Sequence, residues 1–285
     1  MSSADAIRRC GGFFMAFSAR PTVGILGAGK VGTALALALQ RADYSIVGVS
    51  SRSPTSAQAL AQSLVCPVLV PNQLFAQAQL IFLTIPDDHL ATTAQALADV
   101  LDHGTGIVVH CSGALTSAVL QPLQLRGWQV AGCHPLAPFA SRTTPLPPAI
   151  TWAIEAEADV YLVLAELVQA VGGTPRPIQA EHKVLYHSAA VLSANYAIML
   201  AARAVDLLQL CGWSSQESLQ ALVPLLRDNV ENLARVGLPQ ALTGPLARGD
   251  YGTVERHLQA LDANAPDIAS LYRACIEATQ PLLRT

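Results

Sequence analysis

Charged residues are scarce in this chain of 285 residues: they make up 13% of it, and 17 Lys and Arg face 20 Asp and Glu. A nucleic-acid-binding surface usually has a basic excess, so the formal net charge of −3 argues against nucleic acid as a partner. Hydrophobic residues reach 52%, which allows a sizeable core and excludes a globally disordered chain.

Closely spaced cysteine pairs are also missing. The six cysteines, at positions 10, 66, 111, 133, 211 and 275, include no C-x-x-C pair. Disulfide frameworks and thiolate metal sites show tighter, patterned spacing. We therefore expect a reduced, cytoplasmic protein with no metal site.

No long apolar run is free of polar residues. The most lipid-like stretch, residues 184–202, contains His187, Ser188, Ser193 and Asn195, which are costly in a bilayer. We interpret this stretch as a buried helix of a protein that does not contact the membrane.

Residues 1–20 differ from the rest of the chain and are left out of the fold prediction. They contain Arg8, Arg9 and a short apolar patch, without the longer apolar core of a signal peptide. Two interpretations stay open: a disordered tail, or a true start at Met15 rather than Met1.

From residue 22, short apolar runs alternate with helical patterns. We predict strands at 23–26, 45–49, 68–70, 80–85, 106–112 and 129–133, with helices at 29–41, 54–64, 89–101 and 115–125. This alternation is typical of βαβ units and predicts a mostly parallel α/β sheet. After the proline-rich passage 135–148, a further βαβ unit (150–155, 159–171 and 175–179) would extend it.

From residue 181 only helical patterns follow. We therefore expect a cofactor-binding α/β domain at 21–180 and an all-α domain at 181–285. A strongly apolar helical domain needs its surface covered, so we expect the second domain to form a homodimer as well as to contact the substrate.

A glycine motif, G-x-G-x-x-G, follows the first predicted strand and opens the first predicted helix. In a dinucleotide site the first glycine makes a tight turn, the second admits the pyrophosphate, and the third packs helix against strand. We expect cofactor contacts from Gly27, Ala28, Gly29, Lys30, Val31 and Gly32. The alternative is a glycine-rich turn that binds nothing.

The end of the second predicted strand carries Ser50, Ser51, Arg52 and Ser53 and no acid. An NAD site usually has an acid there for the ribose 2′-hydroxyl, whereas arginine and hydroxyls suit a 2′-phosphate. The sequence therefore predicts NADP(H) rather than NAD(H). Ser53 also suits the cap of the next helix, and the two roles are compatible.

Ligands of open α/β sheets bind beyond the carboxyl ends of the strands. Thr84, Ile85 and Pro86 follow one such strand and should lie along the cofactor, although a purely structural strand stop explains them nearly as well.

Two later strand ends should open toward the nicotinamide. Ser112 either binds a substrate oxygen or caps a helix before Ala114, and Gly113 leaves room beside it. His134 is an acid, a substrate contact or a packed imidazole, and we favour the packed role slightly.

Lysine is rare: Lys30 and Lys183 are the only two in the sequence. Because arginine supplies most of the positive charge, Lys183 is a candidate for chemistry that needs an ammonium able to lose its proton. His187 shares its helical face, and Asn195 lies on the same broad side. Together they could deliver a proton and orient a carbonyl. The alternative is a surface lysine with a core histidine.

A polar turn in the helical region supplies further substrate candidates, Thr243, Arg248 and His257. Arg248 suits bidentate binding of a carboxylate. The cluster could instead be an interhelical turn with an Arg–Asp pair, in which Thr253 caps the helix that carries His257.

These residues resemble two-domain Rossmann oxidoreductases of the superfamily of ketopantoate reductase, 6-phosphogluconate dehydrogenase and β-hydroxyacid dehydrogenases. More closely, the chain resembles a subfamily that joins a Rossmann-like domain to a helical domain of uncharacterised function. The resemblance rests on GILGAGKVG (24–32), TIPD (84–87), HCSGAL (110–115), HPLAPF (134–139), KVLYHSAAVLSANY (183–196) and TGPLARGDYGTVERHL (243–258).

The resemblance implies that Lys183 is a general acid or an electrostatic partner of the substrate oxygen. It places Ser112 where β-hydroxyacid dehydrogenases hold their substrate, and Thr243 near a substrate segment of ketopantoate reductase. The superfamily's assisting asparagine lies one turn after the lysine, where this chain has His187, with Asn195 two turns further.

The leading interpretation is an NADPH-dependent reductase that transfers hydride to the carbonyl of a small 2-oxo acid, such as 2-dehydropantoate. One alternative is an imine reductase resembling pyrroline-carboxylate reductase. Another is a non-catalytic NADP(H)-sensing protein.

Overall fold

The computed structural model describes residues 20–283, so the interpretations of residues 1–19 lie outside the described residues. The chain divides into two compact units between Val191 and Leu192, later than the boundary expected near 180. The difference arises because the first helix after the sheet, α7 (Lys183–Ser193), is anchored to the sheet by the Lys183 side chain.

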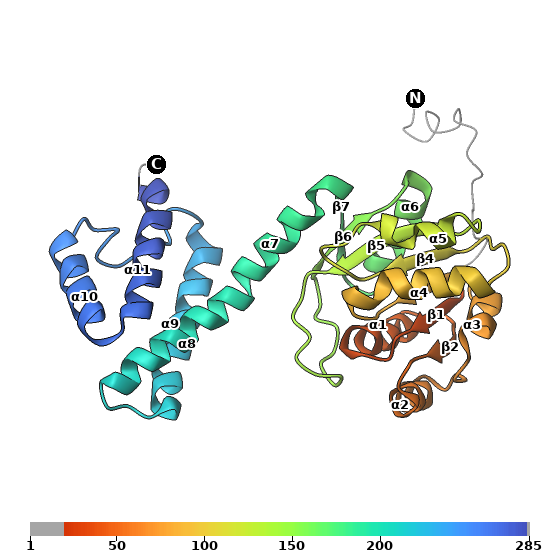
Figure 1. Ribbon diagram of the computed structural model, residues 1–285, viewed down its shortest axis with the longest axis horizontal. Coiled ribbons are helices and arrows are strands. Elements are labelled where there is room, and N and C mark those ends of the chain that lie inside the picture. Colours follow the sequence, from red (N-terminus) through yellow and green to blue (C-terminus); the bar gives the residue numbers. More distant parts are fainter. Residues whose placement is uncertain (1–19, 284–285) are drawn as a thin grey trace. The chain divides into compact units, whose positions relative to one another are not determined.

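The first unit contains a seven-stranded sheet in the order β2-β1-β3-β4-β5-β6-β7 (Figure 1). Neighbouring strands are parallel except β5 and β6, which are antiparallel. The mostly parallel sheet and its added βαβ unit are thus confirmed. The strands are β1 (Val23–Leu26), β2 (Ile46–Ser50), β3 (Leu80–Leu83), β4 (Ile107–His110), β5 (Gln129–Pro135), β6 (Thr151–Glu155) and β7 (Thr174–Pro177).

Helices cover both faces of this sheet because successive strand residues point to opposite sides. Ile25, Phe82 and Val109 pack on one side with α1, α2 and α6, whereas Ile81 and Val108 pack on the other with α3, α4 and α5. The helices are α1 (Lys30–Arg41), α2 (Pro54–Leu64), α3 (Pro71–Gln77), α4 (Asp87–Val100), α5 (Gln121–Gln124) and α6 (Ala158–Ala170), with 3₁₀ turns η1 (Ser117–Leu120) and η2 (Ala180–His182).

Two predicted elements are wrong in detail, and proline explains both. Residues 68–70 form only an isolated bridge between Val68 and Val49, because Pro67 lacks an N–H for a ladder and Pro71 starts α3, which was not predicted. The helix predicted at 115–125 is the turn η1 followed by the short α5, since a proline at 122 suits a first turn but not a helix interior.

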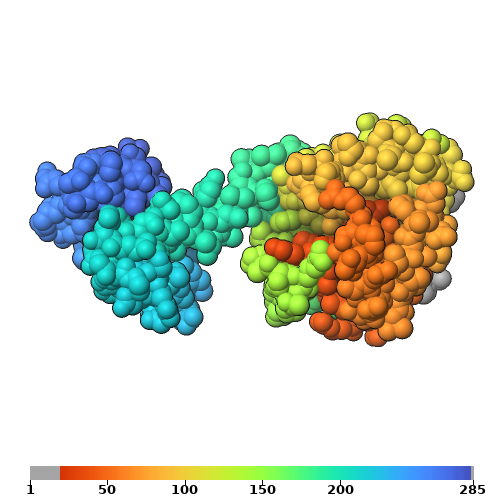
Figure 2. All heavy atoms as spheres, turned by 60° about the horizontal axis from the view of Figure 1, so that its bottom comes forward, coloured from red at the N-terminus to blue at the C-terminus, as the bar shows by residue number. Residues whose placement is uncertain are grey.

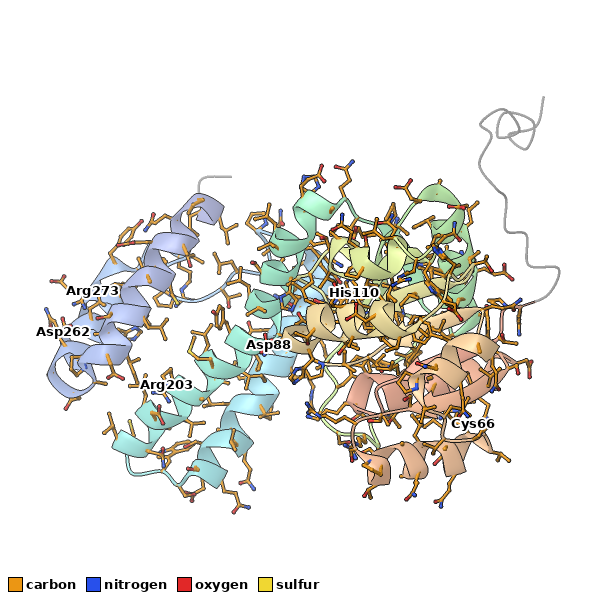
Figure 3. All side chains as sticks on the ribbon, turned by 45° about the vertical axis from the view of Figure 1, so that its right-hand side comes forward. Cys66, Asp88, His110, Arg203, Asp262 and Arg273 are labelled. Carbon is orange, nitrogen blue, oxygen red and sulfur yellow. The ribbon has the colours of Figure 1, made fainter. Side chains whose placement is uncertain are left out.

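The second unit consists of helices within the described residues 192–283. They are α8 (Asn195–Leu210), α9 (Ser215–Val236), α10 (Tyr251–Asn264), α11 (Pro266–Thr279) and the 3₁₀ turn η3 (Gln280–Leu283). Ser214 and Glu217 form a capping box at the start of α9. An ion pair joins Arg273 of α11 to Asp262 of α10, and both residues are labelled in Figure 3.

The apolar stretch that contains α7 and α8 is not a buried helix, contrary to the expectation. Residues 180–210 are long and apolar enough to span a membrane by length and composition, and their most apolar window has no buried residue. Within the described chain, only the first turn of α7 is buried in the sheet unit, through Lys183. Because this stretch begins inside that unit, its composition alone is weak evidence for a membrane span.

Candidate active site

The glycine motif forms the turn between β1 and α1. Gly27 has a φ of +119°, and its N–H donates to the Ser50 carbonyl at 2.8 Å. A Cβ on Gly27 would lie 2.5 Å from the Thr84 carbonyl oxygen, and one on Gly32 would lie 2.0 Å from that of Gly27. A Cβ on Gly29 would meet only the Thr84 oxygen, at 3.9 Å. The outer glycines therefore allow the turn and close packing, while the middle one leaves the approach to the helix N-terminus open.

A cavity of about 810 Å³ lies at this turn, beyond the carboxyl ends of β1, β2 and β3. Figure 2 shows this side of the sheet unit, hollowed between the orange residues after β2, the gold residues of α4 and the lime β5–β6 loop. Lys30, Val31 and Gly32 do not line the cavity. The predicted cofactor residues that do are Gly27, Ala28, Gly29, Ser50, Ser51, Arg52, Ser53, Thr84, Ile85 and Pro86.

The cavity is cationic. Arg52 and Arg142 both line it, and Arg52 Nη1 lies 3.3 Å from His89 Nε2. Among the described residues that line it, none is acidic. Ser53 lines it too, while its hydroxyl accepts a hydrogen bond from the Ser56 N–H and caps α2, so both roles proposed for Ser53 fit the geometry.

Sequence reasoning missed several cavity residues, among them Asn72, His89, Thr92, Thr93 and Arg142. Asn72 belongs to α3, which was not predicted, and Arg142 lies in an irregular loop with no motif. Only His89, Thr92 and Thr93 could have been found from the sequence. They occupy the first turns of the helix after Pro86, next to a strand end where a ligand is expected.

Ser112 follows β4, and its hydroxyl is fully occupied. It donates to Asp87 Oδ2 at 2.6 Å and accepts from the N–H groups of Ala114 and Leu115 at 3.2 and 3.0 Å. Its side chain is buried, so the structure places it as a cap of the following turn. Through Asp87, this turn is tied to the strand end that lines the cavity.

Lys183 is buried at the start of α7, with 1% of its surface exposed. Its ammonium donates to the Ser112 carbonyl at 3.2 Å and lies 3.7 Å from Glu155 Oε2. Burial lowers the pKa of Lys183, against the opposing effect of the Glu155 carboxylate. Glu155 also accepts from the Ser117 N–H and hydroxyl, each at 2.7 Å. Lysine and glutamate together thus hold both ends of the turn from Ser112 to Ser117.

His110, at the end of β4, lies inside the sheet unit (Figure 3). Burial, and then the Lys183 charge, lower the pKa of His110 to about 3, although the Thr116 backbone favours the proton. Its Nδ1 accepts from the Ser112 N–H at 3.1 Å, and its Nε2 has no partner of good geometry in the described chain. The ring is therefore neutral at pH 7 and helps to fix the Ser112 turn.

The rings of His134, Tyr186 and His187 lie together near Gly113. His134 Nδ1 lies 2.8 Å from the Tyr186 hydroxyl, and the His134 ring meets those of Tyr186 and His187 edge to face. A Cβ on Gly113 would lie 2.6 Å from His187 Cδ2 and 3.0 Å from His134 Nε2. The glycine is needed here because α7 brings its rings against the backbone after β4.

The ionisation of this group follows its burial. Burial lowers the pKa of His134 to about 4, with smaller effects from His187 and the Lys183 charge. Burial also raises the pKa of Tyr186 to about 12. At neutral pH the pair is a neutral imidazole and a protonated phenol.

The remaining predicted residues, Asn195, Thr243, Arg248 and His257, belong to the second unit. Asn195 is exposed at the start of α8, and Thr243 and Arg248 are exposed in the turn before α10. His257 Nδ1 lies 2.9 Å from the Tyr272 hydroxyl, a contact between α10 and α11.

The cap of α10 differs from the expectation. Asp250, not Thr253, caps the helix: its carboxylate accepts from the Thr253 N–H at 3.0 Å and from the Thr253 hydroxyl at 2.7 Å. A carboxylate is the better cap here because it takes both bonds at once. The ion pairs of the described chain do not include one between Arg248 and Asp250.

Two family models match the chain, and the boundary between them lies before β6 rather than at the division between the two compact units. Residues 15–138 match the family model of a Rossmann-like domain, and residues 150–279 match a domain of unknown function, DUF2520. A search of curated proteins gave no match.

Solved structures share the fold along most of the chain. A Bacteroides fragilis protein assigned as an NADP oxidoreductase is 24% identical, with a TM-score of 0.72, over 90% of this chain and 97% of that one. Protein TM1727 of Thermotoga maritima is 22% identical, with a TM-score of 0.74 over 92% and 98%. A reductive aminase of Aspergillus terreus, solved with NADPH and ethyl levulinate, is 20% identical, with a TM-score of 0.66 over 92% and 94%. At these identities the likeness shows the fold, a Rossmann-like domain followed by helices.

Proposed function

We propose that the chain is an NADPH-dependent reductase that binds its cofactor in the cavity at the glycine turn. The observation that carries this proposal is the combination, in one cavity, of the open Gly29 turn with the cationic Ser50–Ser53 segment and the absence of an acid from the described lining. A carboxylate at that position would repel a 2′-phosphate, whereas arginine pairs with it. The NADP oxidoreductase and NADPH-bound aminase of the same fold support this choice.

The strand order indicates where the reaction would take place. Along the carboxyl edge, the ends of β2, β1 and β3 carry the cavity, and those of β4 and β5 come next, with Ser112–Gly113 and His134. A dinucleotide that begins at β2 and extends along the edge would bring its nicotinamide toward β4 and β5. We therefore propose that the substrate binds at Gly113, beside His134, Tyr186 and His187.

When bound, NADPH supplies the hydride for a carbonyl or imine carbon. The residues around Gly113 would then manage the proton. Tyr186 is protonated at neutral pH and would give its phenol proton to the substrate, while neutral His134 holds the hydroxyl through Nδ1; the phenolate would then regain a proton from solvent. His187, partly exposed on the same side, would orient the substrate.

Lys183 would act on this site without touching the substrate. Its ammonium is sealed under the Ser112 carbonyl, so a direct contact with substrate would require the Ser112–Ser117 turn to move. Its charge instead fixes that turn and polarises the Ser112–Gly113 peptide, which faces the proposed substrate position. Ser112 supports the same turn, and Asn195, Thr243, Arg248 and His257 stay candidates for the substrate's far end.

The preferred substrate class is a small 2-oxo acid, such as 2-dehydropantoate, with Arg248 as the carboxylate ligand. A second candidate is an imine, favoured by the shared fold of the reductive aminase. Titrations with NADPH and NADH, followed by cofactor fluorescence, test the first step, and tighter NADH binding would refute it. NADPH consumption with panels of 2-oxo acids and cyclic imines then separates the two classes. Tight NADPH binding without turnover on either panel would favour a sensor.

We further propose that the second unit pairs with a second copy of the chain. Helix α8 has no buried residue, α9 buries only Ser218, and both expose large apolar side chains. Such a face needs a cover. Light scattering should give a dimer mass. Leu226→Glu with Val230→Glu, one turn apart on one exposed apolar face of α9, should give monomers, whereas Asp228→Lys on the opposite face should not, and a wild-type monomer would refute the proposal.

A further inference from the structure

The loop between β5 and β6 brings an arginine into a cavity far from its own strands. The cavity is lined at the ends of β1, β2 and β3, and β4 separates these strands from β5. Arg142 nevertheless lines it, from the loop 136–150. In Figure 1 this loop extends from β5 and β6 toward the side of the sheet that carries α1 and α2.

The length of the loop fits a crossing of this kind. Four strand spacings separate β5 from β2, or about 19 Å at about 4.8 Å each. The return to β6 crosses five spacings, or about 24 Å, so the whole path needs about 43 Å, and residues 136–150 can span about 50 Å when extended. Most of the loop's reach is thus used if its middle, where Arg142 lies, approaches the end of β2.

Local hydrogen bonds shape the loop around Arg142. The Ser141 N–H donates to the Thr144 hydroxyl at 3.0 Å, and the Thr143 N–H donates to the Ser141 hydroxyl at 3.2 Å. The two hydroxyls also lie within hydrogen-bond distance of each other, at 3.0 Å. This compact turn satisfies its own polar groups. It leaves the Arg142 guanidinium, which has no ion pair within the described chain, free for an external anion.

We propose that Arg142 is a second ligand of the cofactor's 2′-phosphate, opposite Arg52. This inference rests on the proposed NADPH function. Arg52 comes from the β2 end of the sheet and Arg142 from the β5 side, so the two guanidiniums approach the cavity from opposite ends of the strand order. A dianionic phosphate can accept bidentate hydrogen bonds from both at once. The β5–β6 loop then acts as a strap over the bound nucleotide.

The test is the affinity of wild-type protein, Arg142→Ala and Arg142→Lys for NADPH, NADH and adenosine 2′,5′-bisphosphate, by calorimetry. We expect Arg142→Ala to lower the affinity for NADPH and for the bisphosphate at least tenfold and to change the affinity for NADH less than threefold. Arg142→Lys should keep part of the lost affinity. Arg176→Ala, an exposed arginine of β7 outside the cavity, is the matched control and should bind like wild type.

The outcomes separate this inference from the function on which it rests. Wild-type affinity in Arg142→Ala overturns the inference alone. An equal loss for NADPH and NADH also overturns it, because it would assign Arg142 to the pyrophosphate. Failure of the wild-type protein to bind NADPH overturns the proposed function and the inference together.

Discussion

Replacing Lys183 by methionine tests whether a buried ammonium organises the site. Methionine keeps the length and apolar stem but removes a group that donates to Ser112 and faces Glu155. Breaking a buried ion pair by removing one partner costs about 3–5 kcal/mol, and an unsatisfied buried carbonyl about 1–3 kcal/mol. The two costs partly count the same lost interaction, so they do not add in full. Glu155 also keeps its two hydrogen bonds from Ser117, and 12% of its side-chain surface is in contact with solvent. We expect the sheet unit to lose about 3–4 kcal/mol.

Urea unfolding followed by tryptophan fluorescence measures this loss. Trp128 and Trp152 are buried in the sheet unit, whereas Trp213 is half-exposed in the second unit, so Trp213→Phe should be the background for all variants. Because the carboxylate's charge causes much of the penalty, adding Glu155→Gln should restore about 1–2 kcal/mol. A loss below about 1 kcal/mol, or no recovery in the double variant, would refute the ion-pair argument.

The same variants separate structure from chemistry. Lys183→Met should abolish turnover while NADPH still binds, because the cofactor cavity does not include Lys183. If the double variant recovers stability but not turnover, the ammonium contributes to the reaction beyond its structural role. Unchanged kcat in Lys183→Met would refute both the predicted and the revised role.

Three further predictions concern the site's surroundings. Because burial lowers the pKa of His134 from 6.5 to about 4, the unfolded state takes up its proton first, and stability should fall as pH drops from about 6.5 to 4. His134 contributes up to about 1.4 kcal/mol per pH unit to the slope of unfolding free energy against pH, and this contribution should be missing in urea titrations of His134→Gln. Gly132→Ala should cost about 1–3 kcal/mol, since its Cβ would lie 2.5 Å from Lys183 Nζ, whereas Gly29→Ala, whose Cβ would meet only the Thr84 carbonyl oxygen at 3.9 Å, should be near neutral in the same assay. Tyr186→Phe should slow turnover at least tenfold with NADPH affinity within twofold, and wild-type kcat would count against its role as a proton donor.

The sequence predicts the glycine turn and the Ser53 cap well because both are local. Gly27, Gly29 and Gly32 act through backbone conformation and close approach within a few residues, and their spacing carries that information. The Ser53 cap needs only the following turn of helix. In contrast, Ser112 could not be assigned as a cap or a substrate ligand from the sequence, because the choice depends on Asp87, which follows another strand.

Long-range placement and exposure were the main sources of error. No residue near Arg142 indicates that its loop reaches the cofactor cavity. The path of the loop depends on the order of the strands in the sheet, which the local sequence does not show. The apolar stretch at 184–202 reads as buried by composition, but burial requires a partner surface that a single chain need not supply. These errors share a cause: periodicity shows which face of an element is apolar, not what covers it.

The rarity of lysine proved informative for a reason that differs from the predicted one. Lys183 Nζ fits against Gly132, between the Ser112 carbonyl and the Glu155 carboxylate. An arginine there would bury a planar group with five donors in a space that offers far fewer acceptors, and a Cβ at position 132 would already crowd the ammonium. Position 183 therefore selects lysine by shape and by the number of hydrogen bonds. That argument holds whether or not the ammonium ever transfers a proton, so the choice of lysine alone cannot assign it as the general acid.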